Sequence, residues 1–318
     1  MKRYIIYILL IFFANICLSQ QLPQISLRQN NLFLNNPAIA GSTSSQEIKL
    51  LHREQWAGFE NAPTTSVISF HKDINTTNGI GGYIINDVTN PSSRFILNLS
   101  YAYIIDMDDV FLSFGLSGKI MQYRINGTDL TYRDFNDPVM AFGTEKKWRP
   151  EANFGMLLYS KNFYAGFSIN NLIKSQFRPF ATGDVGEIEM ARHLYLMGQY
   201  DFITEMHRIS PGIFLGYAKK SPLSTELNVS WLYNNSIHSS LGYRFGDAIN
   251  LSVGYRFGRF SVYYGYDIIT SALRNINSGS HEIMIGIEIS KEQTNVPMFS
   301  SGGNSGRSNY KRSNERMF

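Results

Sequence analysis

One stretch decides the fold class of this chain: Phe95-Ile96-Leu97-Asn98-Leu99-Ser100-Tyr101-Ala102-Tyr103. Its large apolar side chains recur at every second position, and Asn98, Ser100 and Ala102 alternate with them. Because successive side chains of a β-strand point to opposite faces, this period of two predicts a strand with one apolar face and one small or polar face. Alternation alone also fits a soluble sandwich, so other features must decide between the two environments.

The same period recurs in about fourteen segments of about ten residues each between residues 47 and 290, for example from Val110, from Leu227 and from Ile283. Strands of soluble proteins average about five to six residues, whereas about nine to eleven are needed to cross a bilayer at a tilt. An even number of strands is also what closed bacterial outer-membrane barrels require. Length and number together favour a barrel in a membrane.

The links between these segments alternate in length. Long links follow odd-numbered segments, at roughly 123–150, 171–191 and 269–278, and short ones such as Asn234-Asn235 and Gly258-Arg259 follow even-numbered segments. All long links therefore lie on one side. We predict an all-β fold: a transmembrane antiparallel β-barrel of about 14 strands with short periplasmic turns, longer extracellular loops and aromatic girdles at both membrane interfaces.

Composition excludes several classes of protein. The 318 residues have 17% charged and 14% aromatic side chains and a formal net charge of +4. With a mean hydropathy of −0.17, this chain has too much apolar surface and too little charge for a disordered protein. No apolar run of about 18 residues follows the first twenty, which disfavours helical membrane spans. A net charge this small indicates no nucleic-acid partner.

The N-terminus predicts export. Met1-Lys2-Arg3 is basic, residues 4–18 are mainly apolar, and Cys17 and Ser19 supply small residues before a cut at Gln20. We interpret residues 1–19 as a signal peptide, in preference to an uncleaved anchor or a lipoprotein signal, since Asn15 makes a poor lipobox. The mature chain then has no cysteine, which excludes disulfides, thiolate metal sites and cysteine nucleophiles.

Four segments follow from these patterns. After the signal peptide we expect a periplasmic or luminal segment over residues 20–46 and an outer-membrane β-barrel over 47–290. Residues 291–318 lose the alternation and become rich in Gly, Ser and Asn, with several Lys and Arg. This composition predicts a disordered, polar, basic tail.

Charged and amide side chains occupy the face that a barrel turns inward. They are Lys119, Glu226, Asn228, Arg244, Asn250, Arg256, Asp267, Glu282 and Glu288. Two interpretations stay open: a polar channel, or charges that pair across the lumen and fill it. Buried charges persist when they are paired, and this set shows no excess of one sign, so the sequence favours the second and supports no ion selectivity.

No catalytic, cofactor or metal motif stands out. His238, Ser240, Asn250 and Ser252 fall on one inward face of neighbouring strands, so a hydrolase site can be drawn. Ser and Asn are nevertheless the usual filling of a barrel lumen, and no oxyanion donor can be named. We expect a protein that is not an enzyme and that binds no cofactor or metal.

Several motifs resemble one known family. They are Asn36-Pro37-Ala38-Ile39-Ala40-Gly41, Arg53-Glu54-Gln55-Trp56-Ala57-Gly58-Phe59-Glu60-Asn61-Ala62-Pro63-Thr64-Thr65, Gly79-Ile80-Gly81-Gly82 with Asn86-Asp87, Tyr123-Arg124-Ile125-Asn126 followed by Asn136-Asp137-Pro138, and Ser280-His281-Glu282-Ile283-Met284. This set, over about residues 20 to 290, resembles the PorP/SprF family of outer-membrane proteins from the type IX secretion and gliding machinery of Bacteroidota. Asn61 stands where that family often has Gly.

The resemblance implies a barrel that helps particular large adhesins through or onto the outer membrane, beside a separate translocon and periplasmic partners. We expect the stretch after the first strand to form an ordered outer loop, because a mobile loop would gain little from Trp and Phe. Our hypothesis is that this loop docks the C-terminal domain of a secreted adhesin, through Arg53, Gln55, Trp56, Gly58, Phe59 and Pro63. The alternative is a loop that only stabilises the rim. Residues 36–41 are expected to cap the periplasmic mouth.

Three functions are therefore weighed. The motifs favour a non-enzymatic secretion component that binds an adhesin. A transport barrel for small solutes is the alternative, and it requires an open lumen. An outer-membrane hydrolase survives only if His238 or Ser240 proves essential for a measured esterase activity.

Overall fold

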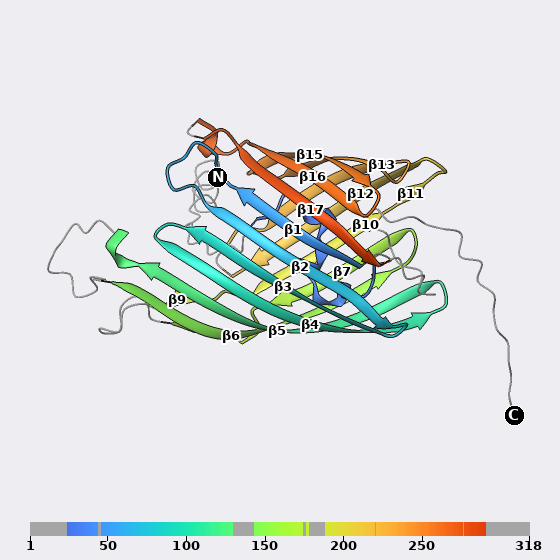
Figure 1. Ribbon diagram of the computed structural model, residues 1–318, viewed down its shortest axis with the longest axis horizontal. Coiled ribbons are helices and arrows are strands. Elements are labelled where there is room, and N and C mark those ends of the chain that lie inside the picture. Colours follow the sequence, from blue (N-terminus) through green and yellow to red (C-terminus); the bar gives the residue numbers. More distant parts are fainter. Residues whose placement is uncertain are drawn as a thin grey trace, which may run out of the picture.

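The computed structural model describes residues 24–43, 46–129, 143–173, 176–177, 188–219, 221–275 and 277–290. Within these ranges fourteen antiparallel strands form one closed barrel (Figure 1). The barrel strands are β1 (Gln46–Glu54), β2 (Thr64–Asn75), β3 (Asn78–Thr89), β4 (Ser92–Met107), β5 (Val110–Asn126), β6 (Thr144–Tyr159), β7 (Phe163–Asn170), β10 (His193–Tyr200), β12 (His207–Ala218), β13 (Ser224–Tyr233), β14 (Ile237–Arg244), β15 (Ala248–Phe257), β16 (Phe260–Ile269) and β17 (Ser280–Ser290). The predicted fold class is confirmed.

Each strand pairs with its neighbours in the chain, and two further pairings complete the ring. The first and last strands pair at Leu50 and Ile285, and β10 pairs with β12 at Leu196 and Leu215. Short β11 (Phe202–Ile203) adds to β12 only, while β8 (Gln176–Phe177) and β9 (Ile188–Glu189) form a separate two-stranded sheet. Because the ring is closed, the barrel strands leave no open sheet edge to be satisfied within a membrane.

Alternation along the strands separates the two faces of the wall as predicted. In β4, Leu99 is 67% exposed on the outer face, whereas Asn98 and Ser100 are buried on the inner face. The two Gly-Tyr-Arg-Phe-Gly repeats behave in the same way. Their Tyr and Phe side chains, at 243, 245, 255 and 257, are exposed on the outside, and both Arg side chains point inward. The outer face is therefore the one that suits lipid.

The two ends of the barrel differ in their links. We call the end with links 55–63, 127–143, 171–192 and 270–279 the long-link end, and the opposite end, whose links have two to six residues, the short-link end. Two strands were predicted too short. β5 continues past residue 122 and β6 begins before residue 151, and both project beyond their neighbours (Figure 1). The two extensions have the geometry of the rest of the strands, but their side chains are mostly polar. A search for alternating apolar residues therefore did not reveal these extensions.

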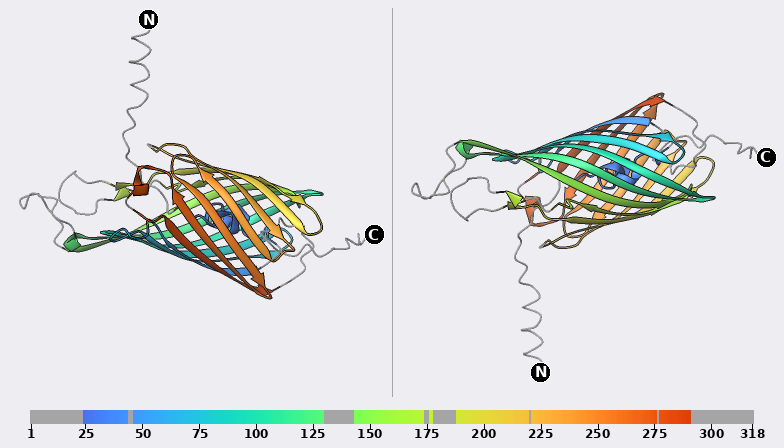
Figure 2. Two further views of the ribbon diagram at one scale, coloured as in Figure 1. Left: turned by 90° about the horizontal axis from the view of Figure 1, so that it is seen from above. Right: turned by 90° about the horizontal axis from the view of Figure 1, so that it is seen from below.

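Residues 24–43 lie inside the barrel. Both views of Figure 2 show this blue segment enclosed by the strands. It contains three short 3-10 turns, η1 (Arg28–Asn30), η2 (Leu32–Leu34) and η3 (Pro37–Ile39), and most of its residues are buried. We call residues 24–43 the luminal segment. Among the residues that the structure describes, no helix has the length and apolar character to cross a membrane.

The luminal segment runs from one end of the barrel to the other. At the long-link end, the Gln24 side chain accepts a hydrogen bond of 3.2 Å from Arg244, at the end of β14. At the other extreme, Gly41 packs on Gly79, directly after the β2–β3 turn at the short-link end. The chain then enters β1 at that same short-link end. Residues 36–41 accordingly pack inside the short-link half of the lumen.

Apolar contacts hold the luminal segment against the wall. Leu27, Phe33 and Ile39 are buried in one cluster with inward side chains of many strands, among them Ile104 and Met284. The Phe33 ring meets the edge of Tyr83 at 5.9 Å and lies 4.9 Å from the His71 ring. Burial of such side chains contributes roughly 1.5–3 kcal/mol each. The lumen thus serves as the hydrophobic core of the protein.

Inward glycines let the backbone of η3 approach the wall. A Cβ atom on Gly115 would lie 2.2 Å from the amide nitrogen of Ala38, and one on Gly155 would lie 1.9 Å from Oδ1 of Asn36. That same Asn36 oxygen caps η3 by accepting a 2.9 Å hydrogen bond from Ala38, while its Nδ2 donates to the Met156 carbonyl at 3.0 Å. Only glycine fits at these two positions of β5 and β6.

We predict that Gly115→Val destabilises the barrel, by about 1–3 kcal/mol or more, because the new side chain meets backbone that cannot move aside. Gly118→Val is the matched control: it lies on the same strand with nothing within 4 Å of its Cβ. Urea unfolding of the purified protein in detergent measures both variants. Equal free energies of unfolding would contradict the close packing of η3 against β5.

The path of the luminal segment predicts on which side of the membrane Gln24 lies. An epitope inserted directly before Gln24 should be accessible from the same side of the membrane as an epitope after Glu60, because Gln24 lies at the long-link end. An epitope after Lys161, in the β6–β7 turn, marks the opposite side. Antibody labelling of intact and permeabilised cells distinguishes the two. If the epitope before Gln24 is labelled under the same conditions as the Lys161 epitope, and not as the Glu60 epitope, the path described for the luminal segment is wrong.

Candidate functional site

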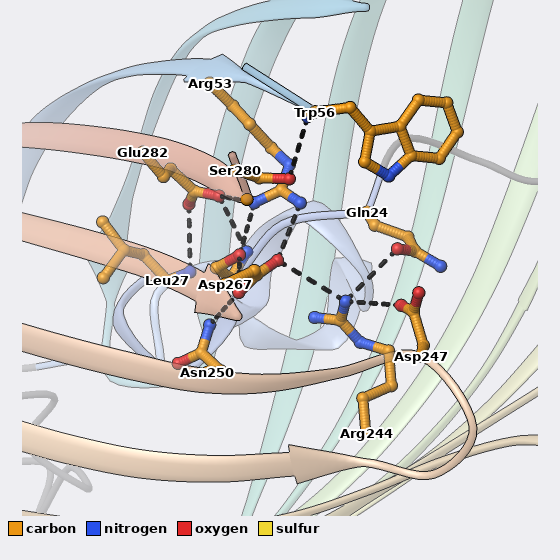
Figure 3. Close-up of polar contacts among 12 residues, drawn as sticks. Gln24, Leu27, Arg53, Trp56, Arg244, Asp247, Asn250, Asp267, Ser280 and Glu282 are labelled. Atoms are coloured by element: carbon orange, nitrogen blue, oxygen red, sulfur yellow. Dashed lines mark hydrogen bonds and ion pairs between the residues drawn. The ribbon is translucent and has the colours of Figure 1, made fainter. Parts of the chain in front are cut away.

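Arg53 lies at the centre of a buried ion-pair network in the long-link half of the lumen. Its side chain points inward from the end of β1 and is 2% exposed. It donates hydrogen bonds to Asp267 Oδ2 on β16 at 2.8 Å and to Glu282 Oε2 on β17 at 3.1 Å (Figure 3). One guanidinium thus joins three strands that include both ends of the barrel sequence.

The luminal segment takes part in the same network. The backbone amides of Ser26 and Leu27 donate to the two carboxylate oxygens of Glu282 at 2.7 and 2.9 Å. The Ser26 hydroxyl donates to Asp267 Oδ1 at 2.7 Å and accepts a hydrogen bond from Arg53. Both carboxylates therefore serve two partners at once, the Arg53 side chain and the segment that crosses the lumen.

Arg244 forms a second centre beside the first. Its guanidinium lies 3.2 Å from Glu226 Oε2 and 2.9 Å from Asp247 Oδ2, and 3.6 Å from Asp267 Oδ2. Glu226 also accepts a 3.1 Å hydrogen bond from Arg28 of the luminal segment. The Arg28 side chain in turn stacks over the Phe214 ring, 3.8 Å from its centroid. Asp267 connects the two centres, and we call the whole set the Arg53–Arg244 network.

The remaining charged residues predicted for the lumen are also inside it. Lys119 is buried and donates to the Asn171 side chain. Arg256 forms an ion pair of 3.2 Å with Glu47, which also lies 3.6 Å from Lys49. Each of Arg244, Arg256, Asp267 and Glu282 thus forms at least one ion pair in the structure. The sequence did not indicate that the luminal segment supplies hydrogen-bond and ion-pair partners to these charged residues, because residues 24–43 contain no motif or spacing that predicts such contacts.

The lumen is filled where the luminal segment meets β3 to β7. The pocket lined there by Phe33, Pro37, Tyr83 and Asn153 leaves no room for a water molecule. Buried hydrogen bonds from Asn31 to Ser69 and from Ser113 to the Ala38 carbonyl, each of 2.7 Å, attach further points of the segment to the wall. The luminal segment therefore fills this side of the barrel, next to β3 to β7.

The first long link, residues 55–63, is ordered by backbone contacts with the last. Ala57 donates to the Gly279 carbonyl at 2.7 Å and accepts from Ser278 at 2.8 Å, and the Trp56 amide donates to Ser280 Oγ at 3.1 Å. Within the link, the Gln55 amide donates to the Pro63 carbonyl at 2.9 Å. Gly58 has a φ of +86°, a conformation that favours glycine. The loop is thus ordered, as expected from its Trp and Phe.

A groove of about 600 Å³ opens at the long-link end between this loop and the β3–β4 link. Phe59 is 49% exposed there, and a 2.8 Å hydrogen bond between Asn61 and Asn90 joins the two links. We call it the outer groove; its lining residues are Trp56, Phe59, Glu60, Asn61, Pro63, Thr89, Asn90, Pro91 and Asp129. Aromatic rings, proline and two carboxylates give it a mixed apolar and acidic character.

The structure separates the residues that the sequence grouped as a docking surface. Trp56, Phe59 and Pro63 line the outer groove, and Gln55 and Gly58 belong to the same loop. Arg53 is instead enclosed in the lumen, where no external partner can reach it. Its position in β1 explains this: odd-numbered residues of the strand, such as Leu51 and Arg53, face inward.

The hydrolase arrangement drawn from the sequence is not assembled. Ser240 Oγ lies 2.6 Å from Ser252 Oγ, so the two hydroxyls bond each other. The His238 ring packs edge-on against Tyr263, with 5.4 Å between the ring centroids. Within the described residues no hydrogen bond joins His238 to either serine, which a serine nucleophile would require of its base.

We predict that Arg53→Ala lowers the free energy of unfolding by about 3–5 kcal/mol, because buried Glu282 loses its ion-pair partner and buried Asp267 keeps only the more distant Arg244. Lys147→Ala, which removes an exposed ion pair with Glu145, should cost at most about 1 kcal/mol. The triple variant Arg53→Met, Asp267→Asn, Glu282→Gln should recover much of the loss. Denaturant unfolding in detergent measures all three. A loss for Arg53→Ala as small as for Lys147→Ala would contradict the role given to this network.

Comparisons with known proteins found similar solved structures and one family of sequences. Solved structures similar to this chain include the Ralstonia pickettii toluene transporter TbuX, with a TM-score of 0.47, 10% identity and coverage of 80% of this chain and 92% of that one. Others are the CymD monoaromatic hydrocarbon channel (TM-score 0.45, 11% identity, 83% and 93% coverage) and the Pseudomonas putida toluene transporter TodX (0.43, 9%, 84% and 93%). Similarity this low says nothing about a transported molecule.

Among curated proteins no sequence matches this chain. A family profile does match, over residues 17–287 and so over most of the chain. Its description is "Type IX secretion system membrane protein PorP/SprF". The chain belongs to this family of type IX secretion membrane proteins.

Proposed function

We propose that this protein is a non-enzymatic outer-membrane component of the type IX secretion and gliding machinery, and that it assists the secretion or surface attachment of specific adhesins by binding their C-terminal domain. The observation that carries the proposal is the ordered outer groove above a lumen that the luminal segment crosses. A barrel whose interior is crossed by its own chain is suited to act as a binding platform in the membrane.

The chemistry of the outer groove supports a protein partner. Trp56, Phe59 and Pro63 offer rigid apolar surface, and aromatic residues of this kind are enriched where proteins bind one another. Backbone hydrogen bonds hold the loop in place without a partner, so little ordering entropy has to be lost on binding. Glu60 and Asp129 add acceptors for the polar groups of an adhesin domain.

Location and orientation are part of the proposal. Export by the signal peptide and the usual sidedness of bacterial barrels would place the long-link end, with the outer groove, at the cell exterior. Other secretion components would then contact the barrel in the membrane or from the periplasm. Residues 1–19 and the basic tail 291–318 lie outside the described residues.

Transport of small solutes is the competing function. It requires an open path, whereas the luminal segment contacts the wall from the long-link end to the short-link end. Liposomes that contain the purified protein should therefore not swell in sugars or amino acids faster than empty liposomes. Rapid swelling would favour the transport barrel.

We expect Trp56→Ala with Phe59→Ala to abolish surface display of the adhesin while the barrel stays assembled, because both residues line the groove and neither belongs to the Arg53–Arg244 network. Mass spectrometry of surface and released proteins measures display, and heat-modifiable mobility of the barrel on gels measures assembly.

Phe245→Ala provides the matched control. This Phe is 52% exposed in a different link at the long-link end and does not line the groove. Display should be normal in this variant. Normal display in the Trp56/Phe59 variant, or equal loss in the Phe245 variant, would overturn docking at the outer groove.

A further inference from the structure

The outer faces of β5 and β6 mark where the membrane ends. On β5 the outward positions from Val110 to Ile120 are apolar except for Gly118, and on β6 they are apolar from Leu158 to Trp148. Each run spans about ten residues, the length of a tilted strand that crosses the hydrocarbon core. Trp148, 52% exposed, ends the run on β6, and Trp is enriched at this interface.

Two cations stand directly beyond that boundary. The next outward charged residues towards the long-link end are Arg124 on β5 and Lys146 on β6, and both are exposed. They are direct partners in the strand register, one step beyond the pair of Gln122 and Trp148. Side chains so paired lie about 5 Å apart at Cβ, and like charges in this arrangement destabilise a sheet.

In the part of the chain that the structure describes, no carboxylate balances this pair. Among the described residues, neither Arg124 nor Lys146 makes an ion pair or a side-chain hydrogen bond. The nearby carboxylates face the other side of the wall and have their own cations: Glu145 lies 3.4 Å from Lys147, and Asp87 lies 2.6 Å from Arg94.

One exposed carboxylate follows the end of β5, but it too has partners. Asp129 accepts a 2.7 Å hydrogen bond from Asn126 and one of 3.4 Å from Thr128. The outward neighbour of Arg124 on β4 is Ser93, which carries no charge. Among the described residues, then, no free carboxylate lies beside Arg124 and Lys146.

We propose that Arg124 and Lys146 bind the phosphate of a phosphorylated lipid headgroup in the leaflet at the long-link end, with Trp148 packed at the boundary of the acyl chains. A lipid fits better than a free anion, because the two cations lie where the apolar runs stop and their aliphatic stems can extend along the barrel surface. This inference rests on the membrane orientation proposed above, but not on adhesin binding.

The test measures lipid binding by the purified full-length protein in detergent. Native mass spectrometry follows titration with diphosphoryl lipid A, monophosphoryl lipid A and an uncharged digalactosyl diacylglycerol. Binding should be tightest for diphosphoryl lipid A. Arg124→Gln and Lys146→Gln should each weaken it about fivefold, and the double variant about 25-fold.

Two controls separate this site from general charge effects. Lys161→Gln removes one exposed cation at the short-link end and should leave binding unchanged, and Arg124→Lys with Lys146→Arg should retain it. Unchanged binding in the double Gln variant, or equal binding of the galactolipid, would overturn the proposal. Displacement of the lipid by millimolar inorganic phosphate would identify a free-anion site and overturn it as well. The adhesin assay is independent of all these outcomes.

Discussion

The rest of the structure depends on the two ion pairs that the Arg53 guanidinium forms inside the barrel. This guanidinium bridges Asp267 and Glu282 on two neighbouring strands, and the same carboxylates accept hydrogen bonds from Ser26 and Leu27. All of these groups are buried, so each charge is tolerable only while its partners stay in place. Closure of the barrel at β1 and β17 and placement of the luminal segment are thereby coupled.

This coupling explains why the lumen is built as a core. Inward glycine and serine residues of the wall lie where η3 approaches, and glycines also make room for the side chains of Phe33 and Leu27. A polypeptide inside the barrel needs its backbone groups satisfied, and wall side chains such as Ser113 and Ser168 supply the bonds. Such a lumen gives rigidity to the mouth, where the outer groove is formed by links rather than by strands.

Prediction from the sequence succeeded for the wall and only partly for the site. The strand number, the lipid-facing side chains and the inward charges all follow from a period of two. Arg53 was grouped with Trp56 and Phe59 because they are close in sequence, yet the strand ends between them and the alternation turns Arg53 inward. The extension of β5 and β6 was missed because its outward residues, such as Arg124 and Lys146, are polar.

The sequence by itself determined the barrel: alternation is a local property, read from neighbouring residues, and strand geometry converts it directly into an outer and an inner face. Only the tertiary structure decided what fills the lumen. The partners of Arg53 lie 214 and 229 residues away, and Ser26 lies 256 residues from Glu282. Contacts over such separations arise from the closure of the ring and the path of the luminal segment, which no local pattern encodes.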